Sequence, residues 1–182
     1  GTASYTDITG DNTQPTPLTE GTAVEFVSAP LAAPLRLTGM PRLQSVMTAS
    51  AARANVVATL MERKADGTQR YLNFAVLNLN HAVTLNETDP DITGKALPVD
   101  INFFPQDNMV AAGSMLALHL AGLVPTDRTT AGDAGNLLNS GPNIQPIGIG
   151  AEVSLDLANS MLTLPVNAGD RVERLSWLEP TE

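Results

Sequence analysis

The amino-acid sequence predicts an all-β fold, an antiparallel β-sandwich, from two observations. The first is a series of short runs in which apolar and polar residues alternate, as at 35–37, 42–48 and 114–122. The second is the punctuation of these runs by Gly, Pro, Asp and Asn, which form turns and end strands. Many short alternating runs separated by such turns are typical of sandwiches. No segment shows helical periodicity over three turns.

Each apolar run justifies one strand. The predicted strands are 24–27, 35–37, 42–48, 55–63, 69–79, 96–104 and 114–122. Two of them flank Asp66-Gly67, and Asp-Gly between two β-rich runs is a strong hairpin signal. A second hairpin is predicted near the end of the chain, where the alternating runs 153–157 and 162–166 would meet across 158–160.

The period of two also predicts which side chains face the core. Leu116, Leu118 and Leu120 alternate with other residues, so they share one face, which we expect to be buried. His119 then lies on the opposite face of the same strand. Phe103 and Phe104 are adjacent, so they point to opposite faces, and Phe104 faces outward if Phe103 faces the core.

The predicted organisation is an extended lead-in followed by one domain. Residues 1–23 are rich in Thr, Gly, Pro and Asp and show little periodicity, whereas residues 24–182 are expected to form a single β-sandwich domain. The start at Gly1 is read as a processing remnant, so the chain is expected to be part of something longer. The Gly-rich loop 125–150 is either functional, packed on a partner, or a disordered excursion.

The composition excludes several classes of partner. The net charge is -9 at pH 7, and no basic stripe is present that would neutralise phosphates, so neither nucleic acid nor an anionic membrane surface is an expected partner. No run approaches the roughly 18 apolar residues of a transmembrane helix. The absence of cysteine removes disulfides, thiol nucleophiles and thiolate metal sites. The absence of cysteine does not identify the cellular compartment, and a secreted or cell-surface bacterial location is compatible with it.

The sequence offers no active-site motif. No Gly is followed two positions later by Ser, so the G-x-S-x-G nucleophile elbow is absent. Two histidines, His81 and His119, cannot form a tetrahedral zinc site without help from carboxylates. The acidic residues of 86–91 do not have the spacing of a calcium loop, so we interpret them as solvated. No phosphate-binding Gly motif occurs, and no cofactor or metal is expected.

Three residues are candidates for a partner interface. Phe104 is an apolar side chain expected to point outward, His119 lies opposite the leucines, and Trp177 follows the last predicted strand, where it would otherwise cap the core. Such a surface would also allow a homo-oligomer. A carbohydrate-binding module and a surface-adhesion module are alternatives. The low aromatic content, 4%, opposes sugar binding, which depends on exposed aromatic platforms.

Six segments occur in an order that resembles a known family. They are SYTD at 4–7, LTGMP at 37–41, the run 56–63 closed by ADG at 65–67, FFP at 103–105, VAAG at 110–113 and LTLPV at 162–166. The ordered set resembles the C-terminal β-sandwich of X-Pro dipeptidyl-peptidases and cocaine-esterase-like (CocE/NonD) serine hydrolases. One departure is Gly113-Ser114-Met115-Leu116, where that family often has Gly-His-Arg-Leu.

The resemblance implies a jelly-roll-like sandwich of the galactose-binding-like type and the role of a non-catalytic accessory C-terminal domain. The implied partner is the α/β-hydrolase catalytic domain of the same parent protein, on which this domain would pack, shaping substrate access or assembly. The nucleophile, acid and base of that family belong to the preceding domain. No catalytic residue is therefore assigned to this chain.

By itself, the chain is expected not to hydrolyse acyl esters or X-Pro dipeptidyl amides, because it lacks a nucleophile elbow and has only two histidines. Assays on short acyl esters and dipeptidyl amides, with a heat-inactivated sample as control, measure this. Turnover above the control that disappears in His81→Ala or His119→Ala would contradict the expectation.

Overall fold

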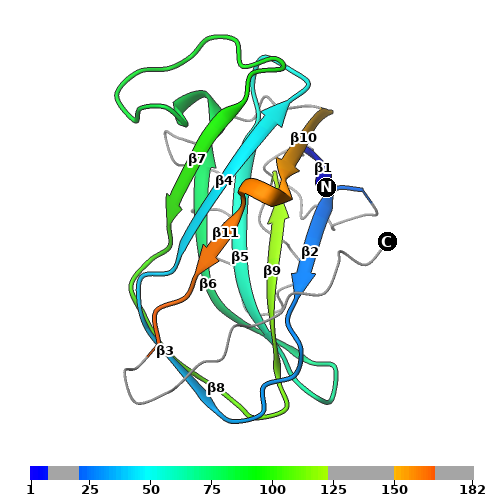
Figure 1. The fold of residues 1–182 in the computed structure, drawn as a ribbon, viewed down its shortest axis with the longest axis vertical. Coiled ribbons are helices and arrows are strands. Elements are labelled where there is room, and N and C mark those ends of the chain that lie inside the picture. Colours follow the sequence, from blue (N-terminus) through cyan, green and yellow to red (C-terminus); the bar gives the residue numbers. More distant parts are fainter. Residues whose placement is uncertain (8–20, 123–149, 167–182) are drawn as a thin grey trace, which may run out of the picture.

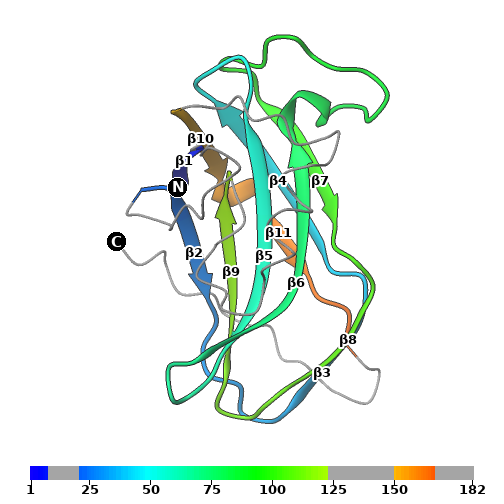
Figure 2. The ribbon, with the colours of Figure 1, turned by 180° about the vertical axis from the view of Figure 1, so that it is seen from behind.

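The fold consists of two facing antiparallel sheets (Figures 1 and 2). The computed structural model describes residues 1–7, 21–122 and 150–166. Sheet A contains β1 (Thr2–Asp7), β10 (Ala151–Asp156), β4 (Arg42–Ala49), β7 (Leu97–Asn102) and the short β11 (Met161–Thr163). Sheet B contains β2 (Ala23–Val27), β9 (Met115–Ala121), β5 (Asn55–Arg63) and β6 (Gln69–Asn78). A separate ribbon pairs β3 (Leu35–Gly39) with β8 (Gln106–Val110), and the two short 3-10 helices are η1 (Leu79–His81) and η2 (Leu157–Asn159).

The strand order is that of a jelly roll. In sheet A, β10 and β7 lie on opposite edges of β4, because Met47 is paired with both Leu155 and Leu97, which gives the order β1-β10-β4-β7. Sheet B has the order β2-β9-β5-β6. The first strand thus pairs with the last long strand, and the second strand with the one before it. This nested order confirms the predicted sandwich and its jelly-roll type.

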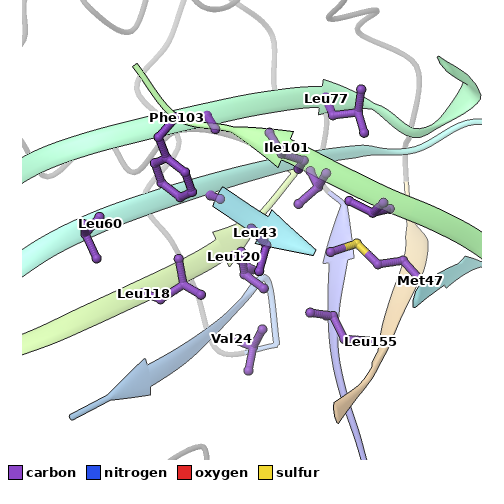
Figure 3. Close-up of a cluster of buried hydrophobic side chains, with 14 of the residues drawn as sticks. Val24, Leu43, Met47, Leu60, Leu77, Ile101, Phe103, Leu118, Leu120 and Leu155 are labelled. Atoms are coloured by element: carbon purple, nitrogen blue, oxygen red, sulfur yellow. The ribbon is translucent and has the colours of Figure 1, made fainter. Parts of the chain in front are cut away.

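One apolar core fills the space between the sheets, as the alternation predicts. Leu116, Leu118 and Leu120 are at most 5% exposed, while the intervening His119 lies on the outer face of sheet B. Figure 3 shows Leu118 and Leu120 of β9 in the same cluster as Met47 of β4 and Leu155 of β10. The predicted orientation of β9 is confirmed.

The predicted Asp-Gly hairpin between β5 and β6 is confirmed. Lys64 N donates to Thr68 O at 2.8 Å, and the Asp66 carboxylate accepts a hydrogen bond from Thr68 N at 2.9 Å. Gly67 has φ +82°, a left-handed conformation that is unfavourable for any residue with a Cβ atom. The turn therefore requires the glycine that the sequence provides.

The second predicted hairpin, between 153–157 and 162–166, is wrong. Strands β10 and β11 do not pair with each other, since both pair with β4, at Leu155↔Met47 and at Met161↔Gln44. They lie one after the other along the same edge of β4, separated by η2. The Asp156 carboxylate accepts from Ala158 N and closes a turn that shifts the chain without reversing it.

The expected lead-in needs a correction for its first residues. Thr2–Asp7 is a full strand, β1, which pairs along its whole length with β10. Its core-facing side chains are Ala3, Tyr5 and Asp7, so it lacks the apolar alternation that marks the other strands. Residues 8–20 lie outside the described residues, and a domain boundary at residue 24 stays a prediction. The polar strand β8 is likewise absent from the predicted strands.

Asp7 places a buried carboxylate at the corner where β1 meets sheet B. Its Oδ2 accepts from Asn55 N at 2.8 Å, and the Tyr5 hydroxyl donates to Asn55 O at 2.7 Å. Oδ1 lies so close to Gly122 that a Cβ there would come within 1.8 Å of it. Burial raises the pKa of Asp7 to about 6, although the hydrogen bonds from Asn55 oppose this shift.

Leu118→Ala is expected to lower the free energy of unfolding by about 2–5 kcal/mol, because a buried leucine is replaced by a cavity. Met161→Ala is the control: its side chain is 55% exposed, so it should change stability by less than about 0.5 kcal/mol. Urea unfolding of both variants measures the difference. Equal, small effects at the two positions would show that β9 does not bury this face.

Asp7→Asn is expected to stabilise the protein increasingly as the pH rises from about 4 to 7. The folded-state pKa of Asp7 lies above the ordinary value of 3.8, so ionisation of this carboxyl over the range lowers the free energy of unfolding of the wild-type protein. The asparagine side chain of the variant does not ionise, so the variant does not have this loss. The full effect is roughly 3 kcal/mol, at about 1.4 kcal/mol per pKa unit. Unfolding free energies of both proteins across this range give the difference, and a difference independent of pH would contradict a buried, titrating Asp7.

Candidate functional site

The outward Phe104 is the exposed end of an aromatic row at the edge of sheet B. Phe103 is 2% exposed and Phe104 is 56% exposed, as the alternation predicts. The ring centroid of Phe104 lies 5.0 Å from that of Phe74, which lies 5.9 Å from that of Tyr71. We call Tyr71, Phe74 and Phe104 the aromatic row. Both Phe74 and Tyr71 come from β6, and both are half-buried.

A bend in the backbone aims Phe104 at β6. The β3–β8 ribbon continues the β4–β7 pair, but the pairing changes from Arg42↔Asn102 to Gly39↔Gln106, so one strand gains a residue at the bend. Phe103 N donates to Pro41 O at 2.9 Å and holds the two chains together there. An extra residue of this kind bends a ribbon and redirects its side chains.

Side chains of β6 and β8 fix the ribbon to sheet B. Asn73 Nδ2 donates to Phe104 O at 2.7 Å, and Arg70 Nη2 donates to Met109 O at 2.5 Å. Asn108 Nδ2 donates to Leu72 O at 3.3 Å. The exposed side chains of Phe104 and Met109, 56% and 57% exposed, are thus carried by a backbone that is already tied down.

The buried carboxylate of Glu62 holds the connection between β8 and β9. Glu62 is 2% exposed and accepts hydrogen bonds from Arg70 Nε at 2.7 Å, Ala111 N at 3.0 Å and the Ser114 hydroxyl at 2.8 Å. Burial by itself would raise the pKa of Glu62, but these donors outweigh it and leave that pKa below its usual value. Glu62 is therefore an ionised anchor for the β8–β9 connection. Ser114 is one of the donors to Glu62. It occupies the position at which the family that the sequence resembles often has His.

His119 belongs to a charge cluster on the outer face of sheet B. Glu25 Oε1 lies 2.6 Å from His119 Nε2 and 2.5 Å from Arg63 Nη2, so the cluster joins β2, β9 and β5. Burial would raise the pKa of Glu25, but the bonds from His119 and Arg63 lower it below its usual value. The predicted outer-face position of His119 is confirmed, and its role in an interface stays a prediction.

The cluster does not have the geometry of a hydrolytic triad. Thr59 is the cross-strand neighbour of His119, which places a hydroxyl, an imidazole and a carboxylate in one row. The Thr59 side chain is 1% exposed, so a substrate cannot reach its hydroxyl. Arg63 also holds the carboxylate in an ion pair, which weakens it as a support for a general base.

The other sequence candidates do not form a site in the described part of the chain. Trp177 and residues 123–149 lie outside the described residues. The carboxylates of Asp89 and Asp91 accept hydrogen bonds from nearby backbone N–H groups, and no group of three or more acidic or histidine side chains is placed to hold a metal among the described residues. The described ranges contain no helix able to cross a membrane. An open depression of about 240 Å³ lies beside Ser50, Glu152 and Ser154 on sheet A.

The sequence did not predict the aromatic row, for a geometric reason. Tyr71 and Phe74 are three residues apart, so strict alternation would place them on opposite faces. The pairing of β5 with β6 changes register at Leu60/Met61, from Leu60↔Asn73 to Met61↔Tyr71. This bulge brings Tyr71 and Phe74 to the same face, and no local sequence signal marks it.

Comparisons with known proteins identify the family and the fold. Residues 2–125 match the sequence model of the X-Pro dipeptidyl-peptidase C-terminal non-catalytic domain. No curated protein matches the chain in sequence. Similar solved structures include an α-amino acid ester hydrolase (TM-score 0.67, 16% identity) and an aminopeptidase from a marine sediment archaeon, Thaumarchaeota archaeon (0.68, 14%). A third is a CocE/NonD family hydrolase from Staphylococcus aureus (0.65, 13%).

In each of these three the match covers 92% of this chain and 33% of the other, so the chain spans about a third of the length of the solved proteins it resembles. At such low identity the likeness shows a shared jelly-roll fold. The sequence match covers well over half of the chain and carries the family assignment. The chain belongs to the family of X-Pro dipeptidyl-peptidase C-terminal domains, which are non-catalytic.

Proposed function

We propose that the chain is the accessory domain of an α/β-hydrolase and packs on its catalytic domain through the surface around Phe104. The observation that carries the proposal is the aromatic row on a fixed backbone, in which Phe104 is exposed and packs against the half-buried Phe74. Family membership supports it, because the family is defined as a C-terminal part of a peptidase. The similar hydrolases also support the proposal, because they are about three times as long as the matched part and so contain further domains.

The chemistry of this surface suits a protein partner. Contiguous exposed apolar side chains mark interfaces, and aromatic residues and Met are enriched there. The charges at its rim are already paired, Arg36 with Asp107 at 2.6 Å and Arg70 with Glu62 at 2.7 Å. A partner would therefore meet an apolar centre with a neutral polar rim. Because the backbone is held in place before contact, little conformational entropy would be lost on packing.

The other two candidates from the sequence, His119 and Trp177, would contribute less to the proposed interface than Phe104. His119 would contribute the edge of its imidazole, since most of the ring is covered and bonded to Glu25. Trp177 lies outside the described residues, and its inclusion rests on its position in the sequence. Packing of this kind would shape access to the substrate or hold an assembly together.

The geometry favours this function over carbohydrate binding. A sugar ring stacks on a flat aromatic platform. The rings of the aromatic row are tilted by 37° between Tyr71 and Phe74 and by 59° between Phe74 and Phe104. These rings do not form such a platform.

Phe104→Ser is expected to weaken association with the separately produced catalytic part of the parent polypeptide by roughly tenfold or more, because an aromatic anchor is lost. Met161→Ser is the matched control, since Met161 is 55% exposed and lies in sheet A, away from the aromatic row. Sedimentation or calorimetry measures both affinities.

Equal affinities for the two variants would rule out Phe104 as an anchor. A natural polypeptide without a hydrolase domain would overturn the proposed function itself.

A further inference from the structure

A second apolar surface lies at one end of the sandwich. The connection between β6 and β7 carries Val83 and Leu85, which are 73% and 74% exposed, more than any other large hydrophobic side chain in the described ranges. Figure 1 shows this loop, in green, at the opposite end from the β3–β8 ribbon. The aromatic row does not include this loop, since its members lie at 71–74 of β6 and at the bend between β7 and β8.

The first half of the loop is fastened by a buried amide. Asn80 is 3% exposed, and its Nδ2 donates to Ala52 O at 2.8 Å and to Asp89 O at 2.6 Å. Asp89 N in turn donates to Asn80 O at 2.8 Å. The two bonds between Asn80 and Asp89 join the ends of the segment that carries Val83 and Leu85, and the bond to Ala52 fixes those ends to the neighbouring turn.

The second half of the loop is fastened to the core. Ile92 is fully buried, and its N–H donates to Ala52 O at 3.2 Å. Gly94 N donates to Ala49 O at 2.8 Å. The tip is thus presented on a rigid base, and a preorganised loop loses little entropy when it binds.

The charges beside the tip have a surplus of one carboxylate. Lys95 forms an ion pair with Asp89 at 2.7 Å, while Glu87 and Asp91 are exposed. Even with the exposed Arg53 of the neighbouring turn, three carboxylates stand against two cations. A second copy would bring the same acidic tip and a net charge of -9, so charge opposes self-association through this loop.

From this geometry we propose that Val83 and Leu85 insert into an aliphatic socket with a basic rim on the catalytic domain of the same polypeptide. The inference rests on the proposed function and adds a second contact to it, independent of the aromatic row. A complementary basic rim matches the surplus of carboxylates, and the socket covers two aliphatic side chains that are otherwise in water.

The absence of cysteine from the chain allows a direct test by single-cysteine labelling. Leu85→Cys, Phe104→Cys and the control Glu152→Cys are compared in the 182-residue chain and in the intact parent polypeptide. Maleimide reaction at each introduced site is followed by mass spectrometry. Leu85→Cys is expected to react at least tenfold more slowly in the parent, and Glu152→Cys, exposed on sheet A, within twofold of its rate in the isolated chain.

The outcomes separate this inference from the proposed function. Protection of Phe104→Cys without protection of Leu85→Cys would leave the proposed function standing and overturn the loop contact. Reaction of both at undiminished rates would overturn both. Protection of Leu85→Cys in the isolated chain that grows with protein concentration would assign the loop to a second copy and overturn the proposal.

The basic rim has its own test. Glu87→Lys, added to Leu85→Cys, should reduce the protection in the parent severalfold, because a like charge would then face the rim. The ratio of rates between parent and isolated chain corrects for the effect of Lys on the thiol itself. Unchanged protection would contradict a basic rim.

Discussion

One core shared by both sheets requires alternate side chains to point away from it, and this constraint determines the surface of the domain. Burial of Leu118 turns His119 outward, where it meets Glu25. Burial of Phe103 turns Phe104 into solvent for the same reason. The exposed ring is thus a consequence of core packing, and the bend that follows it determines which neighbours it meets.

Buried polar groups in this fold secure connections between strands. Glu62 holds the start of β9 and the end of β8, Asn73 holds the backbone of Phe104, and Asn80 holds the β6–β7 loop. Each side chain satisfies backbone groups that have no partner in a strand ladder. Loops fixed in this way keep their exposed apolar residues in one place, which links the interior polar groups to the proposed interfaces.

The sequence pattern predicted the strands whose core face is apolar, the Asp-Gly hairpin and the outward Phe104, because these follow from local alternation and turn chemistry. It did not predict β1, whose core face is Ala3, Tyr5 and Asp7, or the polar β8. Both strands owe their existence to partners far away in sequence, in β10 and β3. The bulge behind the aromatic row and the shift at η2 also depend on register with another strand, which no local pattern records.

The similar hydrolases share this fold at 13–16% identity, so the jelly roll tolerates replacement of most side chains. What a given domain binds must then depend on its exposed residues, because function lies in sites that a fold carries. A single apolar contact would let a rigid sandwich pivot on its partner. Contacts at two separate places, at Phe104 on the edge of sheet B and at Leu85 at one end of the sandwich, would fix its orientation. A fixed orientation is what a non-catalytic domain needs if it is to shape the approach to an active site in its neighbour.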